Sequence, residues 1–181
     1  VILVADEIGL DKFYVVGHSA GGFALLSLAK FYSDRIIKGV SIASLYNYVG
    51  IDYNEKNDDY LTKTGFMDNR NDRNNYTLKV FDRAYEKIGE SEKFDSTKKV
   101  MVNYGASMFP SYNSSDLSVI TTPILVIVAE KDDRIKPEHT IGMSKLIQDS
   151  QLEVVKGAQH FGIVKRKKHV DIVIKHIFNY L

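Results

Sequence analysis

The sequence contains no cysteine, and this absence excludes both a disulfide framework and a thiolate metal site. Net charge is also nearly absent, because 24 Lys and Arg residues stand against 23 Asp and Glu residues, a formal net charge of +1. A chain with so little net charge has no overall field to attract nucleic acid or an anionic membrane. We therefore expect no nucleic-acid partner and no recruitment to a charged membrane surface.

Long hydrophobic runs are missing too. No segment reaches the apolar length of a membrane span, and no signal peptide opens the chain. Together with the lack of cysteine, this favours a cytoplasmic protein without membrane contact. The first residue is Val1 instead of Met, and it already lies in a helical pattern. This predicts that the sequence begins partway through a longer protein.

Short apolar runs alternate with helical patterns over residues 1–43 and 117–181. Gly9 is expected to end the first helix. A second helix should run from Ala20 to about Tyr32, and a third should begin at Pro137. The last helix should bury one apolar face made of Val170, Val173, Ile174, Ile177, Phe178 and Leu181. Strands alternating with helices predict a parallel sheet covered by helices, an α/β fold. Four runs are interpreted as strands: Phe13–Val16 as a buried strand, Ile36–Ala43, Pro123–Ala129 as a strand covered on both faces, and Leu152–Val155.

The composition changes between residues 44 and 116, where Tyr, Asn, Asp and Lys dominate. Two helices are expected there, one around residues 80–88 with an apolar stripe, the other over about 96–108. We interpret residues 44–116 as a helical, cap-like insertion between a first core part, 1–43, and a second core part, 117–181. Tyr46, Tyr48 and other apolar residues of this insertion either line a substrate pocket or pack within the insertion itself.

The strongest chemical signal is Gly17-His18-Ser19-Ala20-Gly21. It stands directly after an expected strand and directly before an expected helix, which is the context of a nucleophile elbow. A serine in such a turn is presented at a helix N-terminus, whose dipole favours developing negative charge. The backbone N–H of Ala20 is then a candidate oxyanion-hole donor. The alternative is a glycine-rich turn in which Ser19 only caps the helix.

A serine hydroxyl needs a base to become a nucleophile, and the sequence offers 5 histidines. His160 follows the last expected strand, in a loop at the carboxyl edge of the sheet, where functional groups of α/β folds gather. His18 is expected to pack beside the elbow. His139, His169 and His176 fit solvated helix positions. The sequence therefore indicates His160 as the base.

The base in turn needs an orienting carboxylate. Asp132 and Asp133 both lie in the loop that follows the apolar strand ending at Ala129, again at the carboxyl edge. The choice between these neighbours stays open at this stage.

Residues 1–43 and 117–181 resemble the C-terminal portion of the α/β-hydrolase superfamily. The resemblance rests on the elbow, on the strand and loop from Pro123 to Pro137, and on Gly157-Ala158-Gln159-His160-Phe161. The chain order Ser, Asp, His is also that of this superfamily. It implies a Ser19–Asp132–His160 catalytic triad, with no cofactor or metal, acting on a small-molecule acyl substrate. The Ala-x-x-Asp-Asp-Arg-x-x-Pro arrangement is similar to prolyl-oligopeptidase-type members, in which the first Asp is the triad acid. This resemblance favours Asp132 and leaves Asp133 to cap the following turn or to pair with Arg134.

Compared with the superfamily, the N-terminal strands and the loop that supplies a second oxyanion donor have no counterpart here. We expect a serine hydrolase that cleaves a carboxylic ester or related acyl bond. A prolyl-type peptidase is one alternative, and a non-catalytic member that binds a ligand or partner with an incomplete oxyanion hole is another. The Phe13–Val16 strand then lacks a neighbour, which predicts self-association through this edge.

Overall fold

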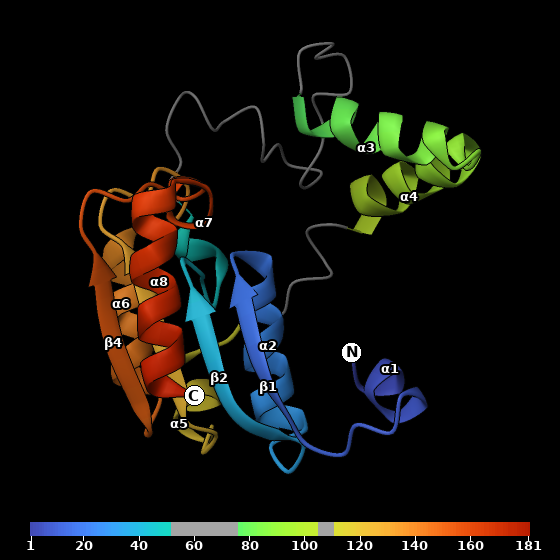
Figure 1. Ribbon diagram of the computed structural model, residues 1–181. Helices are drawn as coiled ribbons and strands as arrows, with labels where there is room; N and C mark the ends of the chain where they lie inside the picture. The colour runs from blue at the N-terminus through green and yellow to red at the C-terminus, as the bar shows by residue number, and fades with distance from the viewer. Residues whose placement is uncertain (52–75, 105–110) are drawn as a thin grey trace. The chain divides into compact units, whose positions relative to one another are not determined.

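A computed structural model describes residues 1–51, 76–104 and 111–181, and between 76 and 104 it describes side chains for residues 82–97 (Figure 1). The chain forms two compact units, Val1–Asp52 with Ser111–Leu181, and Tyr53–Pro110. By these contacts, residues 44–52 and 111–116 belong to the first unit. A cap-like role for the segment between them stays a prediction.

A parallel sheet of four strands, in the order β1-β2-β3-β4, forms the first unit. The register places Val16 of β1 beside Val40 of β2, and Val40 beside Leu125 of β3. Helices cover both faces, as the alternation of strands and helices predicted. The strands are β1 (Phe13–His18), β2 (Ile36–Ile42), β3 (Ile124–Ala129) and β4 (Ser150–Val155).

Each helix on the sheet has a defined strand pair beneath it. In Figure 1, α2 (Ala20–Phe31) and α6 (Pro137–Leu146) lie behind the sheet, α2 on β1 and β2 and α6 on β3 and β4. On the front face, α8 (Lys167–Tyr180) packs on β3 and β4. The shorter elements of this unit are α1 (Ile2–Glu7), η1 (Tyr48–Gly50), α5 (Ser114–Ser118) and α7 (Gly162–Lys165).

The core is centred on β3, because all six of its residues are buried. This confirms the prediction of a strand covered on both faces. Toward α8, Leu125 and Ile127 pack in one cluster with Val40, Val155 and Val173. Gly39 of β2 faces the other way, against Leu25 of α2. The two faces thus follow the alternation of side chains along a strand.

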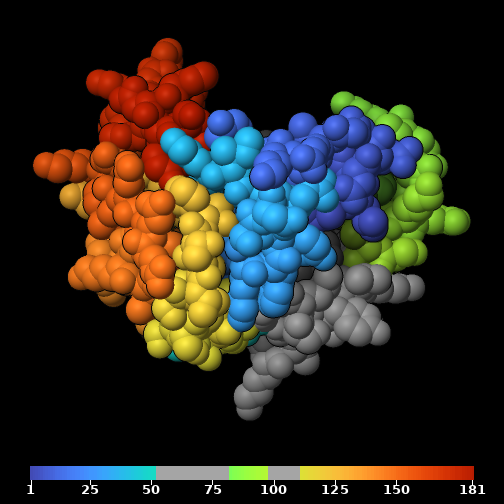
Figure 2. All heavy atoms as spheres, turned by 90° about the horizontal axis from the view of Figure 1, so that it is seen from below, coloured from blue at the N-terminus to red at the C-terminus, as the bar shows by residue number. Residues whose placement is uncertain are grey.

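The first helix is short, and the side chain of Arg35 ties it and the segment that follows it to the turn after α2. It ends before Gly9, whose φ of +69° suits a residue without a Cβ. The guanidinium of Arg35, in the turn after α2, donates to Asp6 Oδ1 at 2.7 Å and to the carbonyl of Leu10 at 2.9 Å. In Figure 2 the dark blue N-terminal segment lies against the light blue segment that contains this turn.

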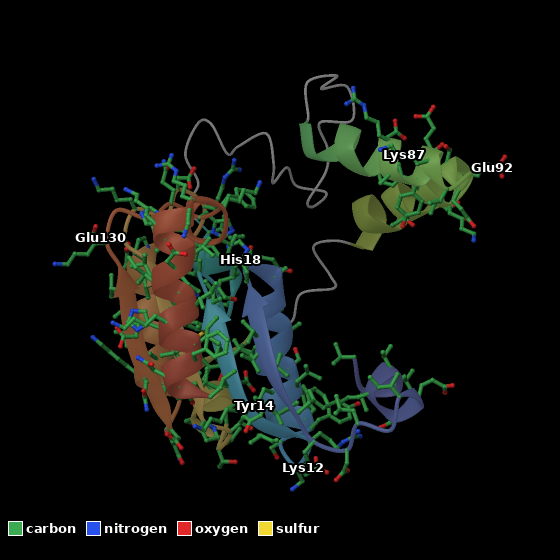
Figure 3. The ribbon with its side chains drawn as sticks, in the orientation of Figure 1. Lys12, Tyr14, His18, Lys87, Glu92 and Glu130 are labelled. Atoms are coloured by element: carbon green, nitrogen blue, oxygen red, sulfur yellow. The ribbon has the colours of Figure 1, made fainter. Side chains whose placement is uncertain are left out.

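Strand β1 is not buried on both faces, contrary to the prediction. Tyr14 is 47% exposed and Val16 is 50% exposed, whereas Gly17, on the face toward α2, is buried. Tyr14 is labelled in Figure 3 on this outermost strand. The physical reason is the reach of α8, which packs on β3 and β4 and leaves the β1 end of that face uncovered by the described residues.

The last helix is rolled relative to the predicted face. His169 and Val173 are buried on it, and Ile177 and Tyr180 pack against the same cluster. Phe178, expected on the buried face, is 80% exposed. At about 100° per residue, positions 169, 173, 177 and 180 fall within about 80° of one another, whereas position 178 lies about 140° from the middle of that face and so points away from the core. Apolar residues lie on both sides of the helix face that contacts the sheet, so the sequence pattern alone did not single out that face.

In the second unit, α3 (Tyr76–Lys87) matches the first predicted helix, while α4 (Ser91–Tyr104) begins earlier than the predicted start at about Ser96. The reason is Gly89, whose φ of +72° ends the first helix so that the next begins almost at once. Phe94 is buried and stacks on Tyr85 with ring centroids 5.2 Å apart. The predicted end near residue 108 lies outside the described residues. None of the described helices combines the length and the apolar character needed to cross a membrane.

We expect the 181-residue chain to self-associate through β1. Among the described strands, β1 pairs with β2 alone, so the backbone groups of its other edge and an apolar face remain open. Sedimentation velocity at micromolar concentration should show dimers or larger species. Val16→Lys, which places a charge on the exposed face, should shift the distribution toward monomer. A wild-type chain that stays monomeric over this range would refute the expectation.

Candidate active site

Ser19 occupies a strained turn between β1 and α2. Its backbone angles are φ 55° and ψ −120°, a region that residues with a Cβ rarely adopt. Its N–H donates to the carbonyl of Ile42 at 2.9 Å, and its own carbonyl accepts from Gly22 N–H at 3.0 Å and from Ser44 Oγ at 2.8 Å. Backbone bonds on both sides therefore hold the serine in this conformation.

Two glycines make the turn sterically feasible. A Cβ on Gly17 would lie 2.2 Å from the backbone carbonyl carbon of Gly21, and one on Gly22 would lie 2.7 Å from Ser41 Oγ and from Ser44 Cβ. A Cβ on Gly21 would meet nothing within 4 Å. Gly17 and Gly22 are thus required for the close approach of strand and helix, while Gly21 faces open space.

Ala20 is the first residue of α2, so its N–H points out of the helix start without an intrahelical acceptor. Ala20 and Gly21 are both exposed, so the start of α2 next to Ser19 is open to solvent. This is the position in which the sequence analysis expected an oxyanion-hole donor.

His160 lies in the turn after β4, and its ring joins two of the predicted residues. Nε2 is 2.9 Å from Ser19 Oγ, and Nδ1 is 2.9 Å from Asp132 Oδ2 and 3.1 Å from Oδ1. The histidine is 2% exposed and Asp132 is also buried, so these bonds are shielded from water. The structure brings Ser19, His160 and Asp132 into one continuous chain of hydrogen bonds.

The two neighbouring aspartates have different partners. Asp132 Oδ1 accepts the backbone N–H groups of Arg134 and Ile135, each at 2.9 Å, so this carboxylate caps the turn as well as binding the histidine ring. From the sequence we expected Asp133 to cap this turn or to pair with Arg134, but the carboxylate that caps the turn is that of Asp132. Asp133 Oδ1 instead accepts the backbone N–H of His160 at 3.3 Å.

Further bonds join the acid loop to the histidine loop. Lys131 N–H donates to the carbonyl of Ala158 at 2.8 Å, and Gly157 N–H donates to Glu130 Oε2 at 2.7 Å. Figure 3 shows His18 and Glu130 at the same end of the sheet, where the strands finish. The carboxyl edge of the sheet thus collects the serine turn and both loops, as expected for parallel strands.

His18 packs beside the elbow, as predicted, and it also makes a specific bond. Its Nε2 lies 2.9 Å from the carbonyl oxygen of His160, and the two imidazole centroids are 4.9 Å apart. Burial lowers the pKa of His18 below its usual value, despite the opposing effect of the bond to the His160 carbonyl. This bond joins residues 142 positions apart, so no local sequence pattern indicates it.

Two of the three histidines that the sequence analysis placed in solvent are packed instead. His169 is 2% exposed, with Nδ1 3.3 Å from the carbonyl of Gly162. His139 stacks on Tyr46 with ring centroids 4.1 Å apart. Burial is the largest cause of the lowered pKa of His139, and the nearby positive charge of Lys136 lowers that pKa further.

The third of these histidines, His176 on α8, keeps partial exposure. Its Nδ1 lies 3.5 Å from Glu153 Oε1, on β4. For all three histidines the surroundings come from other segments of the chain, so the local sequence pattern gave no signal of them.

The stacking on His139 also gives Tyr46 a packing role within the first unit. Tyr46 N–H lies 3.4 Å from His139 Nε2, and its carbonyl accepts the backbone N–H of Tyr112 at 2.9 Å. Most of the other residues proposed for a substrate pocket lie outside the described residues. Within the described ranges, no group of three or more histidine or acidic side chains is arranged to hold a metal ion.

A covered parallel sheet, with a serine turn and two polar loops at its carboxyl edge, defines the class of the protein as α/β. A family model described as the alpha/beta hydrolase fold matches residues 3–166. The chain therefore belongs to the alpha/beta hydrolase fold family, and the resemblance stated from the sequence is confirmed. No match was found among proteins of curated function.

Solved structures share the fold at low sequence identity. A meta-cleavage product hydrolase from Pseudomonas fluorescens IP01 is 19% identical, with a TM-score of 0.63, and the match covers 99% of this chain and 69% of that one. An enol-lactonase from Burkholderia xenovorans LB400 is 18% identical, with a TM-score of 0.65, and the match covers 99% of this chain and 69% of that one. A thermophilic esterase from Thermogutta terrifontis is also 18% identical, with a TM-score of 0.63, and the match covers 98% of this chain and 68% of that one.

Proposed function

We propose that the protein is a serine hydrolase that cleaves a carboxylic ester or a related acyl bond through an acyl-enzyme. The observation that carries this proposal is the hydrogen-bonded chain from Ser19 Oγ through the His160 ring to the Asp132 carboxylate, with 2.9 Å at each of its two links. The family and the names of the structural neighbours, an esterase and an enol-lactonase among them, support hydrolytic chemistry.

The bonds of Asp132 define which nitrogen of His160 carries the proton. Oδ1 already accepts two backbone N–H groups, and an ionised carboxylate has only acceptors to offer. Nδ1 of His160 must therefore be the donor to Asp132. In the neutral ring this leaves Nε2 unprotonated, facing Ser19 Oγ, which is the tautomer that a general base requires.

In the proposed reaction, Ser19 Oγ attacks the acyl carbon while its proton passes to His160 Nε2. The Ala20 N–H donates to the oxygen that gains negative charge, and one such donor is worth about 10²–10³ in rate. His160 then returns the proton to the leaving alcohol, whose bond to the acyl carbon breaks. Water, deprotonated by His160, attacks the ester formed on Ser19 and releases the acid. No metal or cofactor takes part in this sequence.

A covalent serine probe tests the proposal directly. An alkyl fluorophosphonate should label the native protein at Ser19, because only an activated hydroxyl reacts quickly, while heat-denatured protein should stay unlabelled. Mass spectrometry of the tryptic peptide spanning residues 13–30 locates the label. Ser27 lies in the same peptide and bonds to the Tyr112 hydroxyl at 2.8 Å, so it serves as an internal control.

The outcomes of labelling separate the alternatives. Native protein that does not react would support a non-catalytic member that binds a ligand or partner. Label on Ser27, or on a serine elsewhere, would remove Ser19 from the mechanism. If Ser19 is labelled, prolyl peptides and simple esters can each be added as competitors of the probe. Protection of Ser19 by the peptides would indicate a prolyl-type peptidase, and protection by the esters would indicate an esterase.

A further inference from the structure

His160 is held at four points, and two of them are on its main chain. The ring bonds to Ser19 and Asp132. The backbone N–H donates to Asp133 Oδ1 at 3.3 Å, and the carbonyl accepts from His18 Nε2 at 2.9 Å. His160 lies in a turn between β4 and α7. Side chains therefore bind both of its backbone polar groups at a place where neither the sheet nor a helix provides partners.

The four contacts come from two pairs of neighbours in the sequence. His18 directly precedes Ser19, and Asp133 directly follows Asp132. In each pair one residue binds the ring of His160 and the other binds its main chain. The histidine loop is thereby attached to the serine turn and to the acid loop independently of the ring contacts.

Such attachment matters because reaction rates depend steeply on the placement of the reacting groups. A displacement of ~1 Å can lower a rate by about 10²-fold. The ring of His160 can meet Ser19 and Asp132 together only while the backbone that carries it stays in place.

We propose that His18 and Asp133 are positioning residues, which hold the main chain of His160 so that its ring stays in bonding geometry with Ser19 and Asp132. This inference rests on the proposed function of those three residues. His18 acts here as a donor through Nε2–H, and Asp133 acts as an acceptor through Oδ1.

The protonation state of His18 suits this position. A neutral ring with its proton on Nε2 can donate to the His160 carbonyl, and burial, which lowers the pKa of His18, keeps the ring neutral near pH 7. Positive charge on His160 and Lys165 opposes its protonation, and Asp132 favours it. Neutrality matters because His160 becomes positive when it takes the serine proton, and a second cation 4.9 Å away would oppose that step.

The first test compares His18→Phe with His18→Gln. Phenylalanine keeps an aromatic ring but has no donor, whereas glutamine carries an N–H donor at a similar reach and stays neutral at every pH. We expect His18→Phe to lower kcat for an activated ester about tenfold with little change in KM, and His18→Gln to restore most of the loss. His176→Phe, the same change on α8, should leave both constants unchanged.

The pH profile of kcat adds a readout that a purely structural role would not move. In the wild type, protonation of His18 beside His160 should steepen the loss of activity at acid pH. In His18→Gln that contribution is absent, so the acid limb should be shallower. Equal slopes in the two proteins would contradict an effect of His18 protonation on the positive charge that forms on His160.

The second test uses Asp133, so that the inference does not depend on one variant folding. Asp133→Asn keeps a side-chain oxygen that can accept the His160 N–H, while Asp133→Leu has a similar shape and no acceptor. We expect Asp133→Leu to lower kcat about as much as His18→Phe does, and Asp133→Asn to stay near the wild type. Thermal melting of each variant separates an effect on kcat from a loss of folded protein.

A spectroscopic measurement separates failure of this inference from failure of the proposed function. The Nδ1 proton of His160 should give a protected downfield NMR signal in the wild type and in His18→Gln, and should exchange faster in His18→Phe. An inactive wild type with this pattern would overturn the proposed function alone. An active wild type whose His18→Phe and Asp133→Leu variants match it in kcat and in proton exchange would overturn the positioning role.

Discussion

The Ser19→Ala variant should hydrolyse an activated ester about 10⁴-fold more slowly than the wild-type protein, or slower still. Removing the hydroxyl removes the atom that attacks the acyl carbon, and no other oxygen is placed at 2.9 Å from His160 Nε2 among the described contacts. What remains is binding and the oxyanion donor, which act on an attacking water. Initial rates of both proteins at saturating substrate are the measurement.

The variant should retain the fold, which makes the comparison direct. Ser19 Oγ has its one described bond to the His160 ring, and the backbone bonds that hold the turn do not involve it. Alanine keeps the Cβ, so the strain at φ 55° is unchanged. Ser27→Ala is the matched control, because it removes a hydroxyl from the adjacent helix and should leave turnover intact. Comparable rates in Ser19→Ala and wild type would end the role proposed for Ser19.

The parts of the fold that the sequence predicted are those that local patterns determine. The strand at Ile124–Ala129 is apolar on both faces and is buried on both. Gly9 ends a helix, and Pro137 begins one. The Gly17–Gly21 motif indicated the strand-to-helix turn at Ser19 because its first glycine is needed where two backbones nearly touch.

The predictions that failed depend on contacts between distant segments. His139 is packed because Tyr46 stacks on it and Gly50 leaves room for its ring. His169 is buried because α8 is rolled toward β3 and β4, and both flanks of that helix carry apolar residues. Val16 is exposed because its face of β1 has no covering element in the described part of the chain. The spacing of apolar residues along one segment does not show which other segment packs against it.

In the candidate site, too, the sequence alone could not distinguish the roles of two neighbouring residues. Chain order and loop position indicated Ser19 and His160, but Asp132 and Asp133 occupy the same loop and have the same chemistry. Their bonds differ because the turn after Asp132 directs two backbone N–H groups at one carboxylate and places the next carboxylate beside the main chain of His160. Only the three-dimensional path of the loop carries that information.

Asp132→Asn should therefore lower ester turnover by about 10⁴-fold, whereas Asp133→Asn should change it little. The backbone N–H groups of Arg134 and Ile135 need an acceptor, so the amide oxygen of the introduced asparagine would take the place of Oδ1 and its amide nitrogen would face His160. The amide nitrogen is a donor, so the ring would have to turn its unprotonated nitrogen toward the new side chain and carry its proton on Nε2. A protonated Nε2 cannot take the proton of Ser19, and the hydroxyl would lose its base.

The contrast between the two positions is the decisive measurement, since both variants remove one negative charge from the same loop. A loss of charge alone would lower the two rates alike, whereas a wrong tautomer would lower the Asp132→Asn rate only. Asp133→Asn keeps an oxygen that can accept the His160 N–H, so the main chain of the histidine should stay in place. kcat for one activated ester, measured for both variants at equal folded fraction, tests this ranking. The opposite ranking would assign the orienting carboxylate to Asp133 and would contradict the bonding derived from the 2.9 Å contact between His160 Nδ1 and Asp132 Oδ2.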